Sequence, residues 1–188
     1  MKHTLVVRVR DEPGVLNRVT RLFSRRNFNI DSLTVGGSER PDCSRMTIVV
    51  DTRRVPARLV EANLRKLVPV IDVEDVTHRP TVSRDLALIR VRCAPNERSE
   101  LASLVSIFRG RIVDVAADSV IVEVTGAVEK VDGLIALLQP RGIEETVRTG
   151  KVALLRGSAQ AGAVDRGPGG QAGAGAPEGG LNNRCETL

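Results

Sequence analysis

The residues best suited to do chemistry lie in one short turn, Asp11-Glu12-Pro13-Gly14-Val15-Leu16. Gly14 leaves room for a small ligand to approach the backbone without meeting a Cβ atom. If a helix begins here, its unpaired N–H groups and partial positive charge suit a carboxylate. The Asp11 carboxylate can accept hydrogen bonds from an ammonium group. The turn thus carries groups for both ends of a free amino acid, although an ordinary helix start is the simpler interpretation of this segment alone.

The flanking sequence predicts the strand-to-helix geometry that this chemistry needs. A β-branched run precedes the turn and predicts a strand at about His3–Arg10. Apolar residues follow it at helical spacing, namely Val15, Val19, Leu22 and Phe23. They predict a helix at about Pro13–Arg26, with Pro13 in the first helical position, where a missing N–H costs nothing. Asn27 then suits a left-handed helix stop.

The same order of elements occurs twice along the chain. The other elements expected in the first half are strands at Asn29–Gly36, Ser44–Asp51 and Val70–Thr77 and a helix at Pro56–Val68. Those of the second half are strands at Leu86–Cys93, Arg111–Ala116, Ser119–Thr125 and within Ile143–Leu155, and helices at Glu97–Phe108 and Ala127–Leu138. Two βαββαβ units predict an α+β fold of two ferredoxin-like modules, each an antiparallel sheet with both helices on one face. We assign the modules to residues 1–79 and 80–156.

The composition changes at Gly157 to mostly Gly, Ala, Pro and Gln. Such a segment buries too little apolar surface to offset its ordering entropy. We therefore expect residues 157–188 to form a disordered tail. Its glycines do not follow the spacing of a phosphate-binding loop.

Composition and motifs argue against a catalytic role. The three cysteines, Cys43, Cys93 and Cys185, are far apart and form no Cys-x-x-Cys pair, which fits a reducing, cytoplasmic setting and argues against a zinc site. The sequence holds no Gly-x-Ser-x-Gly or His-Glu-x-x-His motif. No apolar run is long enough to span a bilayer, and no signal peptide is visible. We expect a cytoplasmic chain without a catalytic or metal site.

Two other functions of ferredoxin-like modules fit less well. RNA-binding members stack bases on aromatic side chains, whereas this chain has three Phe, no Tyr and no Trp. Its net charge of +5 is therefore not accompanied by the aromatic side chains that RNA-binding modules of this fold use. A phosphate site at the first turn is disfavoured because Asp11 and Glu12 would repel the anion. Both remain minor alternatives.

Several longer segments carry a family resemblance over residues 1–156. They are residues 11–19, 22–26, 28–35, 44–50, 66–68 and 107–115. Together they resemble the small regulatory subunit of acetolactate synthase (acetohydroxyacid synthase), whose first half is an ACT domain, an amino-acid-sensing ferredoxin-like module. Arg21 and Asn27 depart from the family by standing where glycine is expected.

The resemblance implies a non-enzymatic subunit that activates a large catalytic subunit and confers feedback inhibition by valine, or by leucine or isoleucine. It implies a homodimer through the ACT domains, with the second strand of each module pairing across a two-fold axis. The effector site it implies consists of Asp11, Gly14, Val15, Leu16, Asn29 and Ile30. The backbone N–H groups of residues 14–16 would meet the carboxylate of the effector, and Asp11 and Asn29 its ammonium.

The same resemblance assigns the cofactors to the catalytic partner. Thiamine diphosphate, magnesium and FAD are expected there, and none is expected on this chain. No nucleic-acid or membrane partner is implied. The alternative is an ACT-type sensor that regulates a different enzyme of amino-acid biosynthesis.

Overall fold

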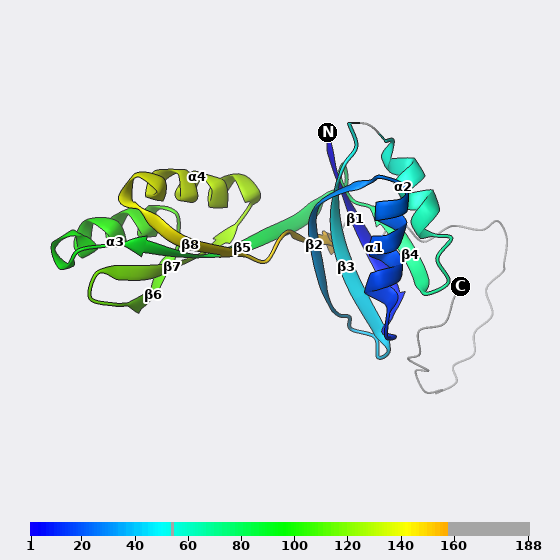
Figure 1. Cartoon of the computed structure of the whole chain (residues 1–188), viewed down its shortest axis with the longest axis horizontal. Helices are drawn as coiled ribbons and strands as arrows, with labels where there is room; N and C mark the ends of the chain where they lie inside the picture. Colours follow the sequence, from blue (N-terminus) through cyan, green and yellow to red (C-terminus); the bar gives the residue numbers. More distant parts are fainter. Residues whose placement is uncertain (54, 158–188) are drawn as a thin grey trace, which may run out of the picture. The chain divides into compact units, whose positions relative to one another are not determined.

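The computed structural model describes residues 1–53 and 55–157 of the 188-residue chain. The expected tail therefore lies, apart from Gly157, outside the described residues. The chain divides into two compact units, one made mainly of residues 1–82 and one mainly of residues 83–153 (Figure 1). No helix in the described part of the chain is both long and apolar enough to cross a membrane.

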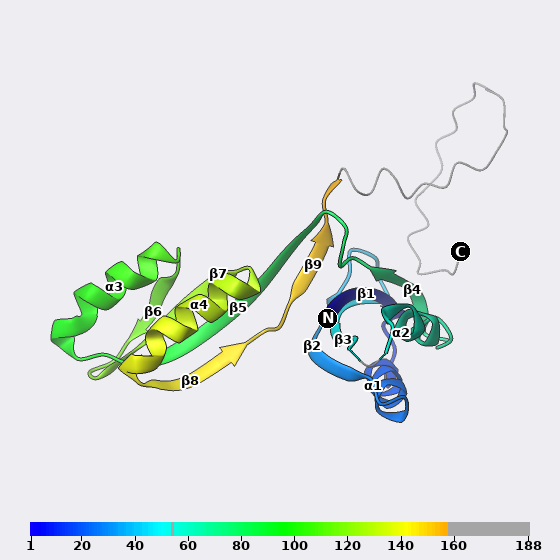
Figure 2. The same cartoon turned by 90° about the horizontal axis from the view of Figure 1, so that it is seen from above.

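The first module contains a four-stranded sheet and two helices. Its elements are β1 (Lys2–Arg10), α1 (Val15–Arg25), β2 (Asn29–Gly37), β3 (Cys43–Asp51), α2 (Ala57–Leu64) and β4 (Val70–Asp75). The strands lie in the order β2-β3-β1-β4, so β2 and β4 are the outer strands. Both helices lie on the same side of this sheet (Figure 2). The predicted βαββαβ order is confirmed.

Alternation along the central strands explains the core of this module. Leu5, Val7 and Val9 project from one face of β1 and are fully buried. The register of β1 and β3 sets them opposite Ile48, Met46 and Ser44, respectively. The helices cover this face with a set of buried apolar side chains, namely Val19, Phe23, Val60 and Leu64. A period of two on the strands and about 3.6 on the helices is what brings these residues together.

The second module repeats this plan with one additional strand. Its elements are β5 (Thr81–Arg92), the 3₁₀ turn η1 (Pro95–Glu97), α3 (Arg98–Ile107), β6 (Arg111–Val115), β7 (Ser119–Gly126), α4 (Val128–Leu138), the 3₁₀ turn η2 (Gln139–Arg141), β8 (Ile143–Arg148) and β9 (Val152–Leu155). The order is β6-β7-β5-β8, and β9 also pairs with β5. One strand was expected within Ile143–Leu155, but two are present because Gly150 adopts a left-handed φ of 82° that interrupts the extended chain.

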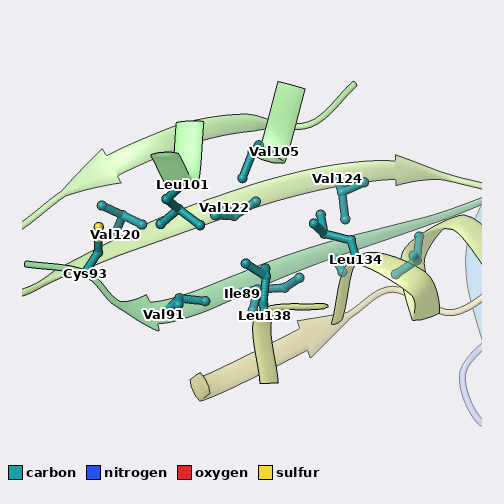
Figure 3. Packing of buried hydrophobic residues seen from close by; sticks show 12 residues of the cluster. Ile89, Val91, Cys93, Leu101, Val105, Val120, Val122, Val124, Leu134 and Leu138 are labelled. Carbon is teal, nitrogen blue, oxygen red and sulfur yellow. The ribbon is translucent and has the colours of Figure 1, made fainter. Parts of the chain in front are cut away.

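The core of the second module is entirely aliphatic apart from one cysteine. Leu101 and Val105 of α3 and Leu134 and Leu138 of α4 point toward the strand residue Ile89 and its neighbours (Figure 3). At the edge of this core, the buried Asp85 of β5 forms an ion pair with Arg148 of β8. Burial lowers the pKa of Arg148, but hydrogen bonds to Asp85 and Asp132 outweigh it and raise the pKa above its ordinary value. The opposite charges of Asp85 and Arg148 therefore compensate each other at a position where burial removes them from water.

Two helix boundaries differ from the sequence prediction. Helix α1 begins at Val15, so Pro13 precedes the helix instead of occupying its first position. Helix α2 ends at Leu64, and turn bonds from the N–H groups of Lys66 and Leu67 close the chain behind it. Pro69 disfavours the helical conformation at Val68, so the helix cannot extend to the predicted end. Val68 is 78% exposed.

Two leucines on helix α4 provide a test of the core. Leu134 is fully buried, whereas Leu137 is 49% exposed. We expect Leu134→Ala to lower the free energy of unfolding by about 2–5 kcal/mol, because it leaves a cavity. The matched change Leu137→Ala should alter it by no more than about 0.5 kcal/mol. Urea unfolding of both variants measures the difference, and equal losses would contradict the described packing.

Candidate functional site

The turn between β1 and α1 is held by backbone hydrogen bonds. The N–H of Asp11 donates to the carbonyl of Asp42 at 2.8 Å, which ties the turn to the start of β3. The N–H of Val15 donates to the carbonyl of Glu12 at 3.3 Å. Between them, Gly14 adopts φ 83° and ψ 0°, a left-handed conformation, at the N-cap of the helix. Glycine is required here by its dihedral angle and not by crowding, since a Cβ atom would meet nothing within 4 Å.

The start of α1 leaves backbone donors available. The first bond of the helix runs from the N–H of Arg18 to the carbonyl of Gly14 at 3.0 Å, and no side chain caps the helix. The N–H groups of Leu16 and Asn17 have no acceptor within residues 1–53 and 55–157. These two donors, with the helix dipole behind them, form a seat for an anion. Sequence reasoning named Leu16 but missed Asn17, which counting the unpaired N–H groups of a first helical turn would have found.

The side chains of the turn divide into those that face solvent and those that form the core. The exposed Asp11 carboxylate has no ion-pair or hydrogen-bond partner in the described part of the chain, whereas Glu12 lies 3.9 Å from Arg10. Leu16 is 44% exposed and offers an apolar surface next to the free donors. Val15 is 5% exposed, so its side chain belongs to the core. Its N–H is also used within the turn, so its predicted contact with a ligand would have to replace that bond.

Asn29 and Ile30 lie at the other end of helix α1. They begin β2, which the chain enters after the helix has run its eleven residues away from Gly14. Eleven residues of helix span about 16 Å at roughly 1.5 Å per residue. Asn29 is exposed and Ile30 half-buried, so both side chains have accessible surface. Within one chain the structure therefore brings Asp11, Gly14 and Leu16 together but not Asn29 and Ile30.

Comparison with known proteins assigns this arrangement to a family. A family model described as an AHAS small subunit-like ACT domain matches residues 5–72, and one described as the small subunit of acetolactate synthase matches residues 84–157. A probable acetolactate synthase small subunit of Archaeoglobus fulgidus is 52% identical over 158 residues, covering 84% of this chain and 99% of that protein. The chain belongs to the acetolactate synthase small-subunit family.

Other relatives agree with this assignment over nearly their whole length. The acetolactate synthase small subunit of Mycolicibacterium smegmatis is 45% identical, covering 86% of this chain and 95% of that protein. The crystal structure of the small subunit from Thermotoga maritima superposes with a TM-score of 0.77 at 41% identity, covering 83% of this chain and 98% of that one. The expected ACT fold and the expected role as a regulatory subunit, not a catalytic chain, are confirmed.

The left-handed glycine of the small subunit gives a prediction with an internal control. Gly14→Ala should cost about 1–2 kcal/mol of unfolding free energy, because an L-residue is strained at this φ although the space is open. Gly36→Ala has equally open surroundings but no left-handed φ, and should be neutral or slightly stabilising. Urea titrations of the two variants measure the change in unfolding free energy that each substitution causes. Equal effects would show that the turn does not hold Gly14 in this conformation.

Proposed function

We propose that this small subunit binds the large catalytic subunit of acetolactate synthase, raises its activity and transmits feedback inhibition by valine. The observation that carries the proposal is the junction of β1 and α1. There, two N–H groups and a carboxylate that have no partner among the described residues lie with an exposed apolar side chain around Gly14. These are the groups that a free aliphatic amino acid needs.

The ligand is oriented by its charges. Its carboxylate accepts hydrogen bonds from the N–H groups of Leu16 and Asn17, and Gly14 lets it approach the backbone. Its ammonium group donates to Asp11. Hydrogen bonds to charged groups contribute about 1.5–3 kcal/mol each. A neutral or decarboxylated analogue therefore loses most of its affinity.

The second half of the site comes from a second copy of the chain. Strand β2 is an outer strand, and pairing with the same strand of a copy forms a continuous sheet with two-fold symmetry. If this antiparallel pair is centred on Leu33, Asn29 lies opposite the partner's Gly37. That end of β2 adjoins the turn, because Ser38 bonds to Cys43 and Asp42 bonds to Asp11. A two-fold dimer thus brings Asn29 of one copy to the Gly14 turn of the other, which a single chain does not do.

The pocket formed in this way selects a branched aliphatic side chain. Leu16 of one protomer and Ile30 of the other line it, and Asn29 adds a hydrogen bond to the ligand ammonium. Valine fits this small apolar wall, with leucine and isoleucine as larger relatives. Thiamine diphosphate, magnesium and FAD belong to the catalytic partner, so this chain acts on the reaction only through binding.

A reconstitution assay tests the proposed role. The purified small subunit alone should form no acetolactate from pyruvate. Addition of the small subunit to its large subunit should raise the rate, and valine should reverse that increase. Unchanged large-subunit activity in the presence of the small subunit would refute activation. Stimulation that valine does not affect would refute valine sensing alone.

Two substitutions test the shared site. Gly14→Asp places a carboxylate where the ligand carboxylate binds, and Asn29→Ala removes a contact from across the interface. Each should weaken valine binding at least tenfold, since losing one charge-assisted hydrogen bond costs about 1.5–3 kcal/mol. Ser99→Asp adds the same charge at an exposed position of the second module and should leave binding unchanged.

A mixed dimer of the two variants separates the possible arrangements. If each site uses Gly14 of one protomer and Asn29 of the other, one site of the mixed dimer is intact and the other carries both changes. Titration calorimetry should then give about half the wild-type stoichiometry. Complete loss of binding in the mixed dimer would place both residues in one protomer's site and overturn the interface.

A further inference from the structure

We infer that the second module contains a separate binding site for an organic phosphate. A cavity of about 450 Å³ lies where the end of α3, the end of β7 and the start of α4 meet. It is lined by the cations Arg84, Arg109 and Lys130, by the apolar residues Ile107 and Phe108, and by Thr125–Ala127. None of the lining residues is acidic. This inference is independent of the proposed function, because it concerns other residues in the other module.

No carboxylate of residues 1–53 and 55–157 forms an ion pair with the cations of this cavity. Arg84 donates to the carbonyl of Ser83 at 2.7 Å, and Lys130 donates to that of Thr125 at 2.8 Å. The guanidinium group of Arg109 has no hydrogen-bond or ion-pair partner among residues 1–53 and 55–157. Five other arginines of the module do form ion pairs with carboxylates, namely Arg90, Arg92, Arg111, Arg141 and Arg148. Arg98 donates to the carbonyls of Ala116 and Ala117 and also forms no ion pair among the described residues, but it lies outside the cavity. Three cations without a carboxylate partner in the described part of the chain therefore lie together at the cavity, where a dianion would compensate them.

The start of α4 adds to the positive electrostatic potential of the cavity. The helix begins at Val128, its N-cap is Ala127, and no side chain caps it. The N–H groups of Val128 and Glu129 have no acceptor within the described residues. Val128 and Glu129 do not themselves line the cavity, so it is the dipole of the helix that adds to the positive charge of the three side chains. The Glu129 side chain, which carries the opposite charge, does not line the cavity.

The backbone at Arg109 is held in a costly conformation. After α3, the N–H of Gly110 bonds to the carbonyl of Val105 and that of Arg109 to the carbonyl of Ser106, which is the Schellman arrangement. Arg109 occupies its left-handed position with φ 49°, although glycine is favoured there. The first module has the same arrangement after α1, where Asn27 takes the position with φ 54°. Asparagine tolerates this conformation better than arginine does, so the backbone alone does not account for the guanidinium at residue 109.

The shape and charge of the cavity define the ligand class. Three cations and a helix start favour a doubly charged phosphate over a single carboxylate. The volume exceeds what inorganic phosphate fills, and the side chains of Ile107 and Phe108 offer an apolar wall to the rest of the molecule. The geometry therefore fits a small phosphate monoester whose organic part has an apolar face.

The proposed phosphate monoester site is tested by calorimetric titration of the full chain with phenyl phosphate, inorganic phosphate and phenol. We expect phenyl phosphate to bind, inorganic phosphate to bind more weakly and phenol not to bind. Arg109→Gly should reduce phenyl phosphate affinity at least tenfold while leaving the melting temperature unchanged or higher, because glycine relieves the left-handed strain. Lys130→Met should weaken binding in the same direction. Arg58→Gln removes one exposed cation of the first module and should have no effect.

Two different outcomes would overturn the inference of a phosphate site. Equal affinity of wild type, Arg109→Gly and Lys130→Met would show that phenyl phosphate binds elsewhere on the chain. Absence of any phosphate binding, with Arg109→Gly weakening association with the large subunit, would make the cavity a protein-docking surface instead. Neither result bears on valine binding, which is measured separately on the first module.

Discussion

Burial of small aliphatic side chains between each sheet and its two helices is the interaction on which both modules depend. The chain has three Phe and no Tyr or Trp, so large aromatic side chains contribute little to the two cores. The cores are filled mainly by aliphatic side chains at alternate positions of the central strands, as at Leu5, Val7 and Val9 and again at Ala87, Ile89 and Val91. A slip of one residue would turn these side chains to the other face. The fixed register in turn sets where each strand ends and each helix begins, and therefore where the unpaired N–H groups of each first helical turn lie.

The two modules share a fold but differ at the junction of their first strand and first helix. In the first module Gly14 leaves the helix start uncapped. In the second module the corresponding junction contains η1, where the Glu97 carboxylate accepts a hydrogen bond from the Ala94 N–H at 3.1 Å. This junction carries its own carboxylate and no left-handed glycine. In the second module, Arg84, Arg109 and Lys130 instead line a cavity next to the start of its second helix, α4. Equivalent folds thus place different chemistry at different helix starts.

The sequence was sufficient for the order of the elements, the buried faces and the left-handed Asn27, because these follow from periodicity and local conformational preference. It was insufficient for two element boundaries: α2 already ends at Leu64, and Gly150 divides the last strand. Residue types correctly indicated a strand-to-helix turn at residues 11–14, but the left-handed Gly14 shifted the helix start and changed which N–H groups are free. The distance from Asn29 to that turn depends on the length of α1 and on tertiary packing, and no local pattern encodes it.

The strand order has a consequence for synthesis on the ribosome. The first strand made, β1, lies between β3 and β4, so the first sheet is complete only when Asp75 has emerged. The second sheet cannot be complete until β9 has emerged, up to Leu155. Domains generally fold as units during translation at about 5–20 residues per second, so the delay is of the order of ten seconds. The first module, which contains the Gly14 turn, can therefore fold while the rest of the chain is still being made.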